Sequence, residues 1–109
     1  MRLAYVMKFV ADMDAAVAFY RDELGLALKF QTPGWSEFAT GETTLALHIA
    51  SDDNPAGGCE LGFSVEDIEA FYAAKSAAGI AFPKPPREQH GVKLATFLDC
   101  DGAKVGVSG

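Results

Sequence analysis

The chain has 109 residues, half of them hydrophobic, which suffices for one folded domain with its own core. Nine basic and fifteen acidic residues give a net charge of −6, which argues against a nucleic-acid partner, because affinity for nucleic acid comes from neutralised phosphates. No apolar run approaches the length of a membrane span, and the N-terminus lacks the pattern of a signal peptide. We therefore expect a cytoplasmic protein without a membrane partner.

The first half of the chain predicts a strand, a helix and three further strands. Residues 3–10 alternate like a strand, and Asp12 is a good N-cap for a helix over residues 13–24. Gly25 supplies the left-handed conformation that ends such a helix. The three further strands are predicted at residues 27–31, 35–39 and 43–50.

The second half repeats this order. A strand at 60–65 precedes Asp67, the next N-cap, and a helix over residues 68–78 that Gly79 ends. A short strand starts at residues 80–82 and is cut off by prolines, so that 83–91 is expected to be a loop. The last two strands are predicted at residues 92–98 and 104–107.

The two halves also share their sequence. Asp12 returns as Asp67, Phe19-Tyr20 as Phe71-Tyr72, and Gly25 as Gly79. We therefore predict an α+β fold of two tandem βαβββ modules, which form a curved mixed sheet around a cavity. Module 1 covers about residues 1–50, a polar linker 51–58, and module 2 about 59–109, all within a single domain of residues 1–109.

These motifs resemble the vicinal oxygen chelate superfamily, which includes glyoxalase I, bleomycin-resistance proteins, fosfomycin-resistance enzymes and extradiol dioxygenases. The resemblance rests on Val10-x-Asp12, Leu24-Gly25-Leu26 and Val65-x-Asp67, and on Phe97-Leu98-Asp99-x-Asp101-Gly102 near the end. It covers essentially the whole chain. It implies the fold strongly and the chemistry weakly, because caps, core aromatics and turns carry it. It also implies a homodimer.

The enzymes of this superfamily hold a divalent metal, and its usual ligand positions fall here on Tyr5, Ala46, Glu60 and Gly106. Ala46 and Gly106 have no donor atom, and a tyrosine must lose a proton with a pKa of about 10 before it binds a metal. One carboxylate does not make a site that needs three or four ligands. We therefore expect no metal and no cofactor; the alternative is one divalent ion in a relocated site built from Tyr5, His48, Glu60 and His90.

The candidate ligand-binding residues are large or polar side chains on the strands that would line the cavity. Tyr5 and Glu60 occupy equivalent positions in the two halves, and a buried Glu60 would need a partner such as a cation. The arginine that binds the carboxylate of glutathione in glyoxalase I falls here on Phe9, which disfavours an anionic substrate. The full predicted set is Tyr5, Met7, Trp35, Phe38, His48, Glu60 and Phe97.

Three functions remain open at this stage. The first is a small-molecule-binding protein of the bleomycin-resistance type, which takes a small aromatic or cationic molecule without a metal. The second is a divergent metal-dependent lyase or dioxygenase that uses His48 and Glu60. The third is a non-catalytic scaffold of the same fold. Whether the chain is an enzyme is left undecided. The two cysteines, Cys59 and Cys100, lack the spacing of a zinc site, and we expect free, partly buried thiols.

Overall fold

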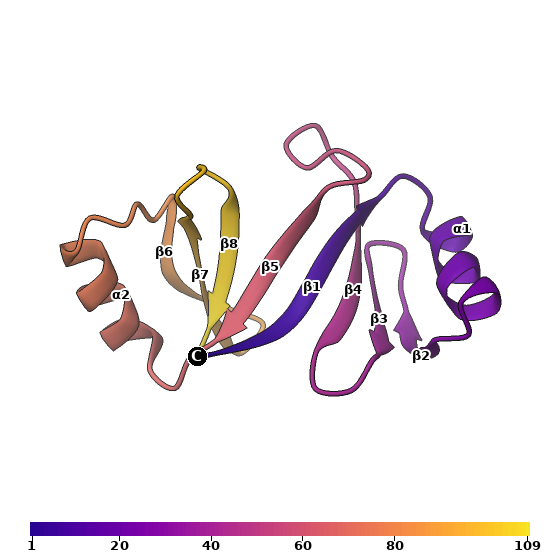
Figure 1. Ribbon diagram of the computed structural model, residues 1–109, viewed down its shortest axis with the longest axis horizontal. Helices are drawn as coiled ribbons and strands as arrows, with labels where there is room; N and C mark the ends of the chain where they lie inside the picture. The colour runs from indigo at the N-terminus through magenta and orange to yellow at the C-terminus, as the bar shows by residue number, and fades with distance from the viewer. The chain divides into compact units, whose positions relative to one another are not determined.

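The computed structural model describes residues 1–109, which form two compact units. The N-terminal unit is Ala4–Cys59, and the C-terminal unit consists of Met1–Leu3 together with Glu60–Gly109. In each unit, helical segments lie against one face of a four-stranded mixed sheet (Figure 1). The predicted α+β class with two tandem βαβββ modules is confirmed. None of the helices has the length and apolar character needed to cross a bilayer.

The N-terminal sheet has the strand order β2-β3-β4-β1, in which β1 and β4 are parallel and the other neighbours are antiparallel. The core lies between this sheet and the helix. Its buried members are Val10, Met13, Val17, Phe38 and Leu47. The elements of this half are β1 (Arg2–Val10), α1 (Met13–Ala18), η1 (Phe19–Glu23), β2 (Ala27–Gln31), β3 (Trp35–Ala39) and β4 (Thr44–Ile49).

The first helix begins as predicted and ends differently. Asp12 is the N-cap, and its Oδ1 accepts a hydrogen bond from the Ala15 N–H at 3.1 Å. The predicted α-helix over residues 13–24 widens after Ala18 into the π-helical turn η1, in which the Leu24 N–H donates to the Phe19 carbonyl. This turn presents Tyr20 to Phe38, with ring centroids 5.9 Å apart. Gly25 follows with a φ of +72°, as its predicted role requires.

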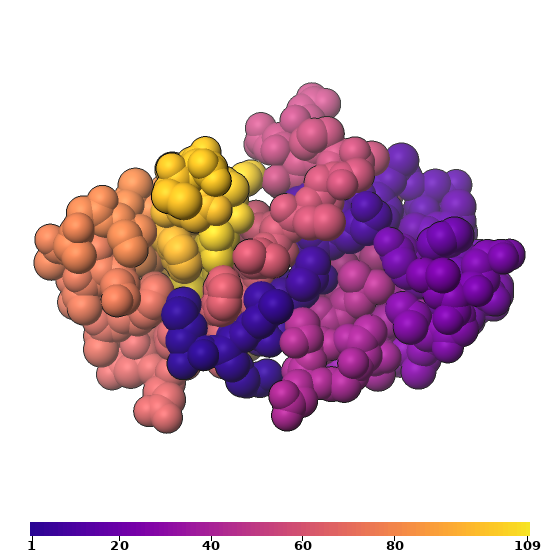
Figure 2. Space-filling model, in the orientation of Figure 1, coloured from indigo at the N-terminus to yellow at the C-terminus, as the bar shows by residue number.

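The predicted linker at residues 51–58 is tied to the end of β1. The Phe9 N–H donates to the Gly58 carbonyl at 2.9 Å, and the Gly57 N–H donates to the Phe9 carbonyl at 3.0 Å. Nearly all of these residues are exposed, and Figure 2 shows them as a protrusion on the surface of the N-terminal unit. The segment is therefore part of the N-terminal unit, held to β1 by backbone hydrogen bonds.

The C-terminal sheet has the order β5-β8-β7-β6, with β5 and β8 parallel. The N-cap Asp67 accepts from the Ala70 N–H at 3.0 Å, and Gly79 follows the second helix with a φ of +99°. The buried core between that helix and the sheet contains Ile68, Ala95 and Val107. The elements are β5 (Cys59–Ser64), α2 (Ile68–Ala77), β6 (Lys84–Gln89), β7 (Val92–Leu98) and β8 (Lys104–Ser108).

The prediction for residues 80–91 was wrong. Residues 80–82 form no strand, and the expected loop contains β6, which pairs antiparallel with β7. Pro85 and Pro86 are tolerated because β6 is an edge strand whose register shifts between Lys84 and Arg87, where no ladder donor is needed. His90 and Gly91 both have positive φ angles, 54° and 79°, and form the tight turn between β6 and β7.

Replacement of either N-cap aspartate by alanine should destabilise the fold. Asp12→Ala and Asp67→Ala each leave a first-turn N–H without its acceptor, so the free energy of unfolding should fall by about 1 kcal/mol in urea denaturation. Asp52→Ala is the matched control, because Asp52 is exposed in the 51–58 segment and caps no helix. Equal effects of all three substitutions would contradict the capping role.

Candidate functional site

One face of the N-terminal sheet is covered by α1, and the opposite face carries a group of aromatic and polar side chains. Side chains alternate between the two faces along a strand, and partners in register share a face. Tyr5, Met7 and Phe9 on β1 therefore lie with Ala46 and His48 on β4 and with Trp35 and Glu37 on β3. We call this surface, formed by Tyr5, Met7, Phe9, Trp35, Glu37, Ala46 and His48, the aromatic face.

Four rings on the aromatic face contact one another edge to face. The ring centroids of Tyr5 and Trp35 are 6.3 Å apart, those of Trp35 and His48 are 5.8 Å apart, and those of His48 and Phe9 are 5.7 Å apart. The interplanar angles lie between 67° and 87°. Aromatic pairs prefer this geometry because the positive ring edge meets the negative ring face. The contacts fix the orientation of the rings relative to one another.

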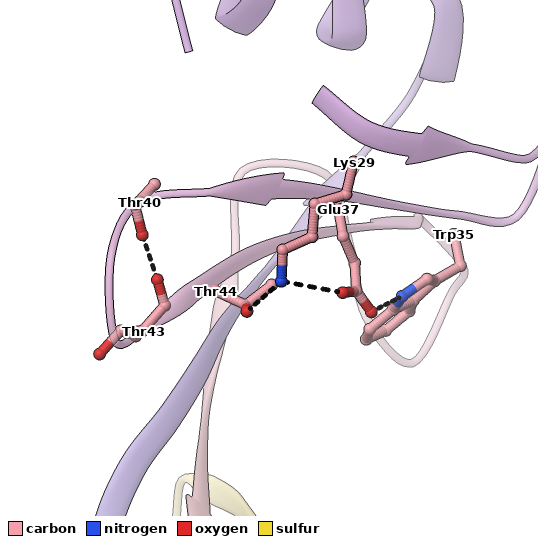
Figure 3. A network of polar contacts seen from close by, with 6 residues as sticks. All are labelled: Lys29, Trp35, Glu37, Thr40, Thr43 and Thr44. Carbon is pink, nitrogen blue, oxygen red and sulfur yellow. Dashed lines mark hydrogen bonds and ion pairs between the residues drawn. The ribbon is translucent and has the colours of Figure 1, made fainter. Parts of the chain in front are cut away.

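Polar contacts hold Trp35 at this position (Figure 3). The Trp35 indole N–H donates to Glu37 Oε2 at 2.8 Å, and the other Glu37 oxygen lies 3.8 Å from Lys29 Nζ. Lys29 Nζ also donates to Thr44 Oγ1 at 3.1 Å. The same view shows the Thr40 hydroxyl bonded to the Thr43 carbonyl in the turn between β3 and β4. Glu37 therefore positions the indole, and Lys29 balances the carboxylate charge.

The predicted site residues in the N-terminal unit divide between two faces. Tyr5, Met7, Trp35 and His48 all belong to the aromatic face. Phe38 does not, and its assignment to the ligand wall is corrected: it is fully buried against α1 and Tyr20. The reason is strand alternation, since Phe38 is three residues from Trp35 and so points to the opposite side. Glu37 is two residues from Trp35 and therefore shares its face. The sequence analysis did not identify it, although this spacing can be read from the sequence.

The two predicted residues of the C-terminal unit also divide. Phe97 lies in the core beneath α2, where its ring centroid is 5.8 Å from that of Phe71, so its predicted place on a ligand wall is corrected. Glu60 lies on β5 on the face away from α2, together with Gly62 and its register partner Gly106. Glu60 is half-buried, and its carboxylate makes no hydrogen bond or ion pair.

The side chains at the positions of the superfamily's metal ligands do not fit a metal centre. Ala46 is completely buried and has no donor atom, and Gly106 is buried and has none either. Glu37, the register partner of Ala46, has its two oxygens directed to Trp35 and Lys29. A divalent ion needs three or four converging ligands, and the aromatic face offers one imidazole and one carboxylate already neutralised by a lysine.

Other ionisable groups lie away from the aromatic face. His90 is exposed in the turn between β6 and β7 of the C-terminal unit, which does not support its place in a relocated metal site. Arg21 in η1 donates to Asp22, and this hydrogen bond lowers the pKa of the Asp22 carboxyl and raises that of the Arg21 guanidinium. The pair is exposed, so it contributes little to stability.

Both cysteines are free and exposed rather than partly buried as expected. Cys100 lies between Asp99 and Asp101, and the ligand atoms of these three residues fall within 4.8 Å of one another. Asp99 Oδ1 already accepts hydrogen bonds from the Asp101 and Ala103 N–H groups at 2.9 and 3.0 Å. These bonds shape the turn between β7 and β8, which is the structural role of this carboxylate.

Two tandem βαβββ modules, each with one helix on one sheet face, define the vicinal oxygen chelate fold. The chain belongs to the Glyoxalase/Bleomycin resistance protein/Dioxygenase superfamily, whose family model matches residues 2–107. The resemblance inferred from the sequence motifs is thereby confirmed. Among curated proteins, no sequence matches the chain.

Three solved structures illustrate the shared fold. Methylmalonyl-CoA epimerase from Mycobacterium tuberculosis is 19% identical with a TM-score of 0.79, and the match covers 97% of this chain and 85% of that one. An NAD-dependent benzaldehyde dehydrogenase from Legionella pneumophila is 20% identical with a TM-score of 0.76, covering 95% and 96%. A superfamily member from Vibrio splendidus is 18% identical with a TM-score of 0.73, covering 98% and 97%. At these identities the likeness shows the fold and does not extend to activity.

Removal of the Glu37 carboxylate should release the Trp35 ring. Trp35 is the single tryptophan of the chain, so fluorescence excited at wavelengths that tyrosine does not absorb reports on it alone. Glu37→Ala should increase the local motion of the indole, seen as faster depolarisation, whereas Glu37→Gln keeps an acceptor oxygen and should resemble the parent protein. Glu23→Ala removes an exposed carboxylate in η1 and is the control. An unchanged depolarisation rate in Glu37→Ala would refute the positioning role.

Proposed function

We propose that the chain is a small-molecule-binding protein of this superfamily that takes an aromatic molecule on the aromatic face without a metal ion. The observation that carries the proposal is the group of four rings held edge to face beside Ala46, the position at which the superfamily's enzymes have a ligand atom. Ligand sites are typically aromatic and apolar with a few polar groups. The aromatic and apolar surface comes from Trp35, Met7 and Phe9. The polar groups come from His48 and Glu37.

A cationic group on the ligand would suit Glu60. Its half-buried carboxylate has no partner, and removing an unpaired charge from water is costly. The net charge of −6 favours a cation over an anion in general terms. Pairing of two copies of the chain is also part of the proposal, and light scattering in solution would measure it.

Binding is tested by the fluorescence of Trp35. A panel of neutral and cationic bicyclic aromatic compounds should contain members that quench Trp35 saturably and raise the melting temperature. Trp35→Leu should weaken their binding, measured by calorimetry, by about tenfold, because a ring contact is lost. Phe19→Leu removes an exposed ring from η1 and should leave binding unchanged. If no compound changes either signal, the scaffold hypothesis is favoured instead.

The divergent metal-dependent lyase or dioxygenase expected from the sequence is the alternative function. Elemental analysis of protein purified without chelators separates the two functions. We expect nickel, zinc, manganese and iron far below one ion per chain, because Ala46 and Gly106 provide no donors. A stoichiometric ion that is lost in Glu60→Gln, with Asp52→Asn as the control, would establish the metal-dependent alternative.

A further inference from the structure

The orientation of His48 is fixed by a hydrogen bond within its own strand. His48 Nδ1 lies 2.7 Å from the Ile49 carbonyl oxygen. A carbonyl oxygen accepts and cannot donate, so Nδ1 must carry the hydrogen of this bond. In the neutral imidazole the other ring nitrogen, Nε2, is then an acceptor with a free lone pair. The strand backbone thus selects one tautomer of the histidine.

The acceptor nitrogen is accessible and unused. The His48 side chain makes no hydrogen bond or ion pair besides the one to Ile49. No buried polar side-chain atom in the structure lacks a hydrogen-bond partner. Nε2 has no partner, and His48 is only half-buried, so this nitrogen must reach the surface. It is therefore a hydrogen-bond acceptor on the aromatic face that a ligand can use.

The neighbours of His48 restrict what such a ligand can be. The rings of Trp35 and Phe9 flank the imidazole at 5.8 and 5.7 Å, so the acceptor is set among aromatic surfaces. Glu37, the carboxylate on the same face, already accepts from the Trp35 indole and approaches Lys29. His48 Nε2 is therefore the acceptor on this face that makes no bond within the chain.

We propose that the ligand is a planar aromatic molecule with an N–H or O–H donor, and that His48 Nε2 accepts this hydrogen. This inference rests on the proposed function, because it assumes that the aromatic face binds a small molecule. It adds the chemical class of the ligand and the residue that orients it. An aromatic molecule of the same shape without a donor binds the same rings and leaves Nε2 unpaired.

Two probes of nearly equal shape test the proposal. Indole carries one N–H donor and no acceptor, and 1-benzothiophene carries no donor. Calorimetric titration of the full chain should give indole about three- to tenfold tighter binding, the contribution of one hydrogen bond. His48→Phe keeps a ring and removes the acceptor, so the preference for indole should vanish while 1-benzothiophene binds as before. Phe19→Leu, remote from this face, should keep the preference.

A second measurement does not depend on His48→Phe folding correctly. The chain has two histidines, and His90→Asn leaves His48 as the only one. Asn tolerates the left-handed conformation of residue 90, where φ is 54°, so this variant should fold normally. Nitrogen NMR of its imidazole should show a protonated Nδ1 and an unprotonated Nε2. Addition of indole should shift the Nε2 signal, and addition of 1-benzothiophene should not.

The outcomes distinguish this inference from the proposed function. If both probes bind equally well, or if His48→Phe weakens both by the same factor, the aromatic face binds ligands but His48 is not the acceptor, and the inference is overturned. A protonated Nε2 beside an unprotonated Nδ1 overturns it as well. If neither probe binds, the proposed function fails and the inference fails with it. A preference for indole that disappears with the imidazole supports both.

Discussion

The structure depends on one constraint: each unit has a single helical layer, which covers only one face of its sheet. Because side chains alternate along a strand, every second residue must then enter the helix-covered core, and the others are free of that requirement. Val10, Phe38 and Leu47 meet the core requirement in the N-terminal unit, and Ala95 and Val107 meet it in the C-terminal unit. The residues between them can specialise, and in this chain they carry the candidate site.

The side chains on the face away from the helix differ between the two halves. On the face away from the helix, the N-terminal unit carries Tyr5, Met7 and Ala46. The C-terminal unit carries Glu60, Gly62 and Gly106 at the equivalent positions. Duplication preserved the caps, the cores and the turns, because these are needed for folding in both halves. The side chains on the faces away from the helices differ between the two halves. The proposed aromatic face of the N-terminal unit therefore has no counterpart in the C-terminal unit.

The organisation of the aromatic face is the basis of the proposed binding role. Its carboxylate, Glu37, serves to orient Trp35 and is balanced by Lys29, so that it is not held ready for a cation. Its imidazole is oriented by the Ile49 carbonyl, which leaves one nitrogen available for a ligand. For the proposed ligand, oriented rings and one directed acceptor would lower the entropic cost of binding, because the side chains are already in place.

The sequence by itself determined the fold class, the duplication, both helix caps and most strands, because these follow from local periodicity and from residues such as Asp12, Asp67 and Gly79. It also identified Tyr5, Met7, Trp35 and His48 as neighbours on one surface. It misplaced Phe38 and Phe97 in the site and residues 84–89 in a loop. Only the tertiary structure decided where these residues lie. Contacts between residues far apart in the chain determine which face the helix covers and whether a proline-containing segment can pair as an edge strand. The tautomer of His48 likewise follows from a contact that no sequence pattern encodes.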